Sequence, residues 1–78
     1  MFRVVRYCVQ PFEERADGGI VKGDAQQFRT ADEALRAAQL MKRRVVGAAV
    51  YEVAGWPVQD IWDRPRLLSR FGLVGTLQ

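Results

Sequence analysis

The side chains that most often carry chemistry in enzymes are scarce in this sequence. It contains no histidine, which is the commonest general base, the usual partner of a nucleophilic serine or cysteine, and the commonest metal ligand. Its single cysteine, Cys8, cannot form an internal disulfide or build a zinc or iron–sulfur site. We therefore expect no catalytic residue, no metal site and no cofactor.

Two carboxylates come closest to forming a chemical group. Asp60 and Asp63 lie near Trp62, Arg64 and Arg66. They could form an acid/base pair or hold a cation, but such exposed groups of mixed charge more often form weak surface ion pairs. An enzyme that acts through these aspartates is the weakest of three hypotheses, because it needs a partner to complete the site.

The composition is that of an ordinary globular protein, and it predicts one domain over residues 1–78. The chain is 49% apolar and 27% charged. A chain of this size buries only about 60% of its unfolded surface, so self-association or a partner would add stability. The net charge of +3 mildly favours polyanions as partners. Without a leader-like start or an apolar run that spans a bilayer, we expect a cytoplasmic protein and no membrane anchor.

The clearest element is a helix over residues 31–44. Thr30 is a good N-cap, and Glu33 three residues later completes a capping box. The run is rich in strong helix formers, and Gly47 is expected to end it. The side expected to pack on a sheet carries apolar residues at helical spacing, namely Ala31, Ala34, Leu35, Ala38, Met41 and Val45.

The first half of the chain predicts strands around this helix. β-branched and aromatic residues dominate residues 2–9, and Pro11 is expected to stop the strand. Alternation places Tyr7 and Val9 on one face and Arg6 and Cys8 on the other. The polar residues 11–19 predict a mobile loop. A weaker strand follows at residues 20–22, with a bend before residues 26–28.

The second half predicts a hairpin and a packed tail. Residues 45–53 form a strong strand, Ala54-Gly55 marks a turn, and residues 56–62 return as an antiparallel strand. The tail after Asp63 fits either a short helix or an irregular strand against a sheet edge. The fold class predicted is therefore α+β, with an antiparallel sheet of three to four strands in the order β-β-α-β-β and one helix packed on one face.

Four blocks of sequence and one aspartate carry a resemblance. They are Tyr7-Cys8-Val9-Gln10-Pro11-Phe12, Gln27-Phe28-Arg29-Thr30-Ala31-Asp32-Glu33-Ala34, Gly47-Ala48-Ala49-Val50-Tyr51, Asp60, and Leu67-Leu68-Ser69-Arg70-Phe71-Gly72. In this order they resemble small uncharacterised proteobacterial proteins of about this length, a family of unknown function. The resemblance covers most of the chain and implies a free-standing domain of bacterial type. It brings no activity, substrate or site residue with it.

Three apolar side chains favour a non-catalytic protein-interaction domain. Trp56 and Trp62 are six residues apart and would share one face of a regular strand, either as a surface platform or, more often for such large rings, in the core. Leu40 projects opposite the apolar side of the helix and is expected to be exposed. Together with the apolar second face of the first strand, these residues predict a protein partner, most simply a second copy of this chain.

A weak nucleic-acid-binding domain is the alternative. Cations that hold phosphates and aromatic rings that stack on bases are the usual components of such domains. The chain has neither a run of glycine and aromatic residues typical of RNA-binding strands nor a GXXG loop between helices. The expected phosphate contacts are Arg36, Lys42, Arg43 and Arg44, with one of the two tryptophans stacking on a base.

Overall fold

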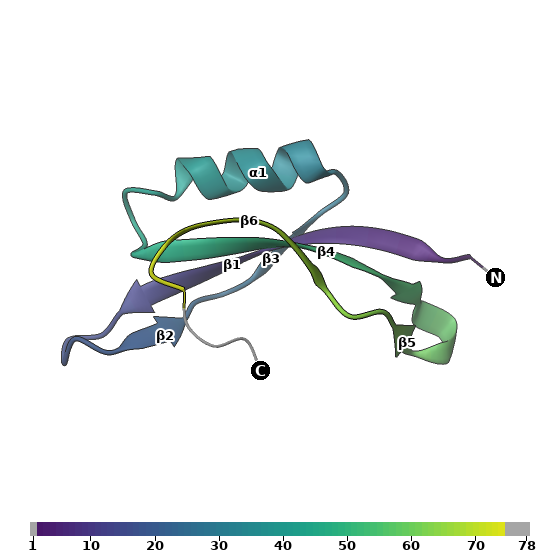
Figure 1. The fold of residues 1–78 in the computed structure, drawn as a ribbon, viewed down its shortest axis with the longest axis horizontal. Coiled ribbons are helices and arrows are strands. Elements are labelled where there is room, and N and C mark those ends of the chain that lie inside the picture. Colours follow the sequence, from purple (N-terminus) through teal and green to yellow (C-terminus); the bar gives the residue numbers. More distant parts are fainter. Residues whose placement is uncertain (1, 75–78) are drawn as a thin grey trace.

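The computed structural model describes residues 2–74 as a curled antiparallel sheet with one helix against one face (Figure 1). In chain order the elements are β1 (Val4–Glu14), β2 (Ile20–Lys22), β3 (Gln26–Phe28), α1 (Ala31–Leu40), β4 (Gly47–Trp56), the 3-10 turn η1 (Pro57–Gln59), β5 (Ile61–Trp62) and β6 (Arg66–Gly72). The α+β class and the single helix are confirmed.

The predicted number of strands is too low because both outer strands are interrupted. β1 and β4 pair at the centre of the sheet. β2 and β3 occupy successive parts of the outer edge of β1, whereas β5 and β6 share the outer edge of β4. Six strands therefore fill a sheet that is four strands wide. The two breaks lie at residues 23–25 and 63–65.

Pro11 does not stop the first strand, which corrects the prediction. In an antiparallel strand, the N–H and C=O of one residue point to the same side. The Pro11 carbonyl accepts a hydrogen bond from the Gly23 amide at 2.9 Å, so its missing N–H faces the break after β2 and not β4. The side-chain amide of Gln10 supplies a donor there, with Nε2 2.8 Å from the Gly23 carbonyl oxygen. The expected loop over residues 11–19 is correspondingly reduced to residues 15–19.

The helix begins where the sequence predicts and ends earlier. Thr30 is the N-cap, and its Oγ1 accepts a hydrogen bond from the Glu33 amide at 3.1 Å. The helix ends at Leu40, and Met41 caps it. The chain then turns back toward β4 through short-range backbone hydrogen bonds, such as that from the Arg44 amide to the Met41 carbonyl. The predicted extension to residue 44 is wrong, because the return to β4 ends the helix before the basic residues.

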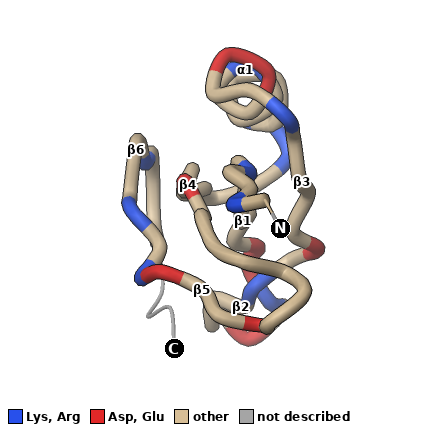
Figure 2. The backbone as a smooth tube through the Cα atoms, turned by 90° about the vertical axis from the view of Figure 1, so that its right-hand side faces the viewer, with Lys and Arg blue, Asp and Glu red and all other residues tan. Residues whose placement is uncertain are grey.

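The hydrophobic core lies between α1 and the face of the sheet beneath it. The sheet curls so that β6 rises beside the helix (Figure 2). Half-buried side chains from β6, including Leu68 and Phe71, close the core from that side. The buried residues of this cluster are Val9, Ala34, Ala38, Met41, Ala48 and Val50, and Phe12, Ala49 and Ala54 are buried outside it. Alanines on the facing surfaces let the helix approach the sheet closely.

The second hairpin turns three residues later than predicted. Ala54 and Gly55 remain inside β4, and the turn is made by η1 with Asp60 in the left-handed conformation (φ 52°). Pro57 at the start of this 3-10 turn needs no backbone donor. The turn therefore lies between Trp56 and Trp62.

The tail is a strand and not a helix. β6 pairs with β4, and a register shift between Val50 and Tyr51 leaves Leu68 as the extra residue of a bulge. Gly72, at φ 64°, ends the strand. A Cβ atom on Gly47 would collide with the backbone of Leu73, so the chain after β6 crosses close to the start of β4.

Candidate interaction surface

The register of the two central strands sorts their side chains onto two faces. Val9 pairs with Val50, and both are buried beneath α1. The neighbouring pair, Cys8 and Tyr51, therefore lies on the face away from the helix. We call this second surface the open face and define it by Arg6, Cys8, Gln10, Tyr51, Val53, Leu67 and Arg70.

A groove of about 470 Å³ crosses the open face. Ala25 lines it at the break between β2 and β3, and Arg64 and Pro65 line it at the break between β5 and β6. The groove thus runs over both central strands from one interrupted edge to the other. Its remaining lining residues are Cys8, Gln10, Tyr51 and Val53, and none of the lining residues carries a carboxylate.

The floor of this groove is uncharged at neutral pH. Burial raises the pKa of the Cys8 thiol, and the nearby Arg6 only partly opposes this effect. Burial likewise raises the pKa of the Tyr51 hydroxyl against a weaker effect of Arg70. Both groups therefore stay protonated, and the charge on the open face comes from arginine side chains. Half-buried and neutral, Cys8 has the environment of a packing residue and not of a reactive thiol.

Exposed apolar side chains lie next to the groove. Leu67 pairs with Tyr51 and is 48% exposed. Trp62 pairs with Gly55, and its ring occupies the space that a side chain at Gly55 would need. Trp62 is 41% exposed, and its indole Nε1 donates a hydrogen bond to Asp60 Oδ1 at 3.0 Å. These two side chains extend the apolar surface beyond the groove.

The two tryptophans do not share a face, which corrects the prediction. Trp56 pairs with Ile61, whereas Trp62 pairs with Gly55, the residue before Trp56. Since successive pairs of a ladder alternate between faces, the two rings point to opposite sides. Trp56 is 36% exposed, so neither ring belongs to the buried core. The prediction from their even spacing was wrong because it assumed that one continuous strand carries both residues.

Leu40 is exposed as predicted but lies on a different surface. It is the last residue of α1, 76% of its surface is accessible, and the helix covers the other face of the sheet. The structure therefore does not join Leu40 to the open face. Leu40 therefore provides a matched control for experiments on Leu67.

The predicted phosphate contacts and the tryptophans are far apart. Lys42, Arg43 and Arg44 follow α1 and precede the first residue of β4, whereas Trp56 is its last. A strand of ten residues is about 30 Å long, so the structure does not bring these groups together. The Lys42 ammonium lies 5.4 Å from the centre of the Phe71 ring, a cation–π contact. Arg36 is exposed on the helix.

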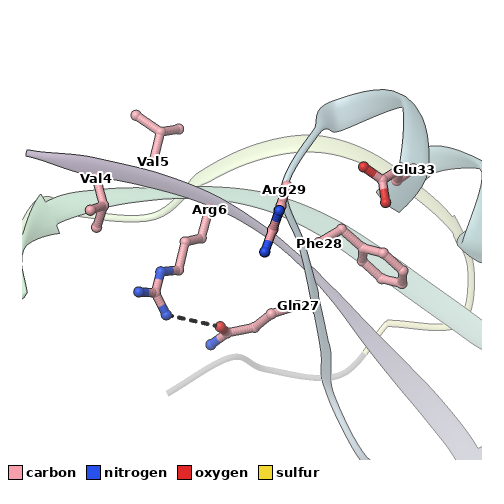
Figure 3. Close-up of a pocket in the computed structure, with 7 residues that line it drawn as sticks. All are labelled: Val4, Val5, Arg6, Gln27, Phe28, Arg29 and Glu33. Atoms are coloured by element: carbon pink, nitrogen blue, oxygen red, sulfur yellow. Dashed lines mark hydrogen bonds between the residues drawn. The ribbon is translucent and has the colours of Figure 1, made fainter.

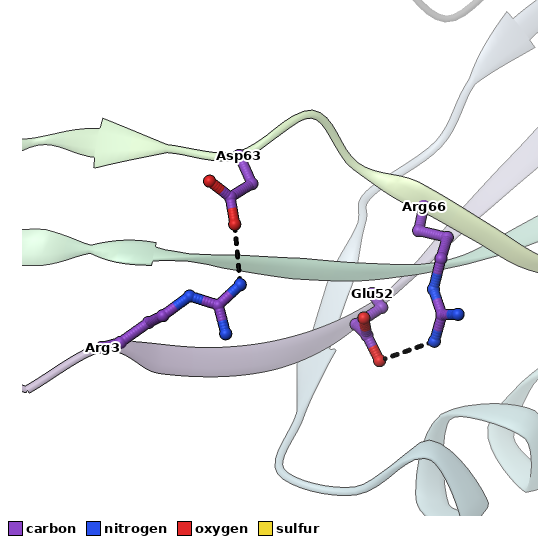
Figure 4. A network of polar contacts seen from close by, with 4 residues as sticks. All are labelled: Arg3, Glu52, Asp63 and Arg66. Carbon is purple, nitrogen blue, oxygen red and sulfur yellow. Dashed lines mark hydrogen bonds and ion pairs between the residues drawn. The ribbon is translucent and has the colours of Figure 1, made fainter.

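The aspartates of the second hairpin serve separate contacts. Asp63 pairs with Arg3 at 2.7 Å, whereas Asp60 accepts the tryptophan indole described above. Glu52 and Arg66 form another ion pair nearby, at 3.1 Å (Figure 4). Within residues 2–74, no three or more acidic or cysteine side chains are grouped to hold a metal ion. The same residues contain no helix that is long and apolar enough to cross a bilayer.

No protein-family model, curated protein or solved structure matches this chain. The resemblance to small proteobacterial proteins therefore stays a prediction.

Sequence reasoning grouped residues of the open face within single strands and missed how the strands bring these groups together. Alternation in the first strand correctly grouped Arg6 with Cys8. The contributions of Tyr51, Arg64 and Pro65 depend on how distant strands pair and where the outer strands break. The Arg64-Pro65 dipeptide did signal a break in the chain, but not the surface that this break would line.

Proposed function

We propose that this chain is a non-catalytic protein-interaction domain that binds a partner protein through the open face. The observation that carries this proposal is that the single helix covers one face of the sheet only. On the other face a groove with an uncharged floor adjoins the exposed side chains of Leu67 and Trp62. Apolar surface gathered around a groove is typical of sites that gain stability when a partner excludes water.

Charge indicates the kind of partner. Arg64 lines the groove, Arg6 and Arg70 lie on the same face, and no carboxylate lines the groove to offset them. An acidic surface on the partner would complement this face and speed association. Two copies stacked by their open faces would instead bring like charges together. The sequence predicts a homodimer through this same exposed sheet face, which these like charges disfavour, and light scattering tests it.

The test compares two matched leucine substitutions. Immobilised wild-type protein, Leu67→Glu and Leu40→Glu are each exposed to extract, and the captured proteins are identified and quantified. Both variants place the same charge at an exposed leucine, but only Leu67 lies on the open face. We expect one partner to be captured by the wild type and by Leu40→Glu and to be lost with Leu67→Glu. Equal capture by both variants, or loss with Leu40→Glu alone, contradicts the proposal.

A nucleic-acid partner is the alternative, now on different residues. Arg70 and Arg64 lie near Tyr51 on the open face, where cations and an aromatic ring could contact phosphate and base. Phosphate contacts lose affinity steeply as salt rises. Labelled protein is titrated with mixed single-stranded RNA and DNA, and amide shifts are recorded by NMR at low and at physiological salt. Open-face shifts that persist at physiological salt favour nucleic acid, and shifts that vanish favour the protein partner.

A further inference from the structure

Among residues 2–74, no strand pairs with the outer edge of the first three residues of β1. Toward β3, β1 is paired only from Tyr7 to Val9, whereas residues 4–6 pair with β4 alone among residues 2–74. β3 ends at Phe28, and the chain then leaves the sheet to begin α1 (Figure 3). An open length of strand edge therefore lies beside the start of the helix.

The backbone of Val5 points into this opening. Its partner on β4 is Ala54, whose carbonyl accepts the Asp63 amide at 2.8 Å on the far side of β4. Val5 and Ala54 are thus a pair without mutual hydrogen bonds, and the Val5 N–H and C=O both face away from β4. Pro11 lies six residues further along β1, so its backbone points to the same side as that of Val5. Its carbonyl does point away from β4, toward Gly23. A backbone donor and acceptor therefore face the open edge.

The opening is a groove with two arginines. Its volume is about 630 Å³, and residues 4–6, residues 27–29 and Glu33 line it. Arg6 and Arg29 extend into it from β1 and from the segment after β3 (Figure 3). The one carboxylate that lines it, Glu33, accepts a hydrogen bond from the Thr30 hydroxyl at 3.1 Å. Val5, 40% exposed, and Phe28 supply apolar surface.

We propose that this edge binds an extended acidic segment of a partner protein by strand addition. The segment would hydrogen-bond to the Val5 backbone, place apolar side chains on Val5 and Phe28, and pair its carboxylates with Arg6 and Arg29. A second copy of this chain suits the edge less well, because pairing two such edges would bring Arg6 and Arg29 of both copies together. The site shares no lining residue with the open-face groove, although Arg6 also belongs to the open face.

A proline substitution tests the backbone contact. Val5→Pro removes the Val5 N–H that faces the open edge and breaks no hydrogen bond to β4. β1 already contains a proline, Pro11, whose backbone also faces away from β4. Val5→Ala is the matched control, because it trims the side chain and keeps the donor. Arg29→Glu is an exposed change that reverses one groove charge without altering a strand. The fold of each variant is checked by its amide NMR spectrum.

The probe is a displayed library of random peptides, selected on the wild-type protein. We expect peptides that alternate apolar and acidic residues, and a synthetic copy of one should shift the amides of residues 3–7 and 27–29. Val5→Pro and Arg29→Glu should each weaken its binding by about tenfold or more, and Val5→Ala by about threefold or less. Peptides without acidic residues, or binding unaffected by either variant, overturn the proposal. So does a dimer that Val5→Pro dissociates, since the occupant is then a second copy.

The outcome is separable from that for the open face. Peptide shifts centred on Tyr51 and Val53, with binding lost in Leu67→Glu and kept in Val5→Pro, would support the open face and overturn the edge site. Failure of the edge variants to change binding says nothing against the open-face groove, because neither Val5 nor Arg29 lines that groove or belongs to the open face.

Discussion

Gln10 takes the place of a backbone donor that Pro11 lacks. Its side-chain nitrogen lies 2.8 Å from the Gly23 carbonyl oxygen and 2.9 Å from that of Pro11. A partly buried carbonyl without a donor costs free energy, so this side chain allows β1 to continue through a proline in the interior of the sheet. The sequence shows both residues, but only the pairing shows that one compensates for the other.

We predict that Gln10→Ala destabilises the fold by about 1 kcal/mol, because the Gly23 carbonyl loses its donor. In a Pro11→Ala background the loss should be smaller, since the new amide at position 11 points at the same carbonyl. Urea unfolding of the two single variants and the double variant measures this coupling. Equal losses from Gln10→Ala in both backgrounds would show that the side chain does not replace the backbone donor.

The raised pKa of Cys8 predicts a pH dependence of stability. Burial favours the neutral thiol in the folded protein, so the unfolded chain loses this proton at lower pH. The stabilisation is complete below the unfolded pKa and declines as pH rises through the folded one. Urea midpoints followed from neutral to alkaline pH should fall less steeply for Cys8→Ala. Parallel declines in the two proteins would contradict this assignment. Tyr51 contributes with the same sign at higher pH.

The start of α1 could be read from the sequence, whereas its end could not. A cap depends on residues within one turn, and Thr30 and Glu33 are three positions apart. The end of the helix depends on where β4 begins, which is set by its pairing with β1. Helix propensity continued through Lys42 and Arg43, but the return to the sheet prevailed over it.

Removal of the helix cap should have a measurable and local cost. Thr30→Ala leaves the Glu33 amide without its side-chain acceptor, and we predict a loss of about 1 kcal/mol in the free energy of unfolding. Arg36→Ala, at an exposed position within α1, should change it by less than about 0.5 kcal/mol. Thermal or urea unfolding compares the two. Similar losses of unfolding free energy in both variants would mean that the Thr30 cap does not stabilise the helix more than an ordinary exposed side chain does.

Strand faces were predictable only where a strand is continuous. Alternation put Val9 and Cys8 on opposite faces, and the structure places Val9 in the core and Cys8 on the other side. It failed for Trp56 and Trp62, because the turn between them puts each on its own strand. The sequence indicated both breaks, at the bend before residues 26–28 and at Arg64-Pro65, but not the groove that they line, which depends on pairing between distant segments.

The whole molecule is elongated, measuring 46 × 24 × 16 Å, and this shape separates features that the sequence suggested together. The basic residues after α1 and the second hairpin lie at opposite ends of β4. The open face lies between these ends and combines its own arginines with an apolar groove. A binding surface in this protein is therefore better described by the sheet than by its helix or hairpin.

The most direct test of the open face uses Cys8, which lines its groove. The alkylation rate of this single thiol is measured for the free protein and with the captured partner at saturation, and each rate is referred to that of the urea-unfolded chain. We predict that the partner slows alkylation of the wild-type protein by about tenfold or more. The partner should leave the alkylation rate of Leu67→Glu unchanged, because this variant should not bind it. A partner that binds the wild type without slowing the reaction of Cys8 would contradict the assignment of the open face as the interaction surface.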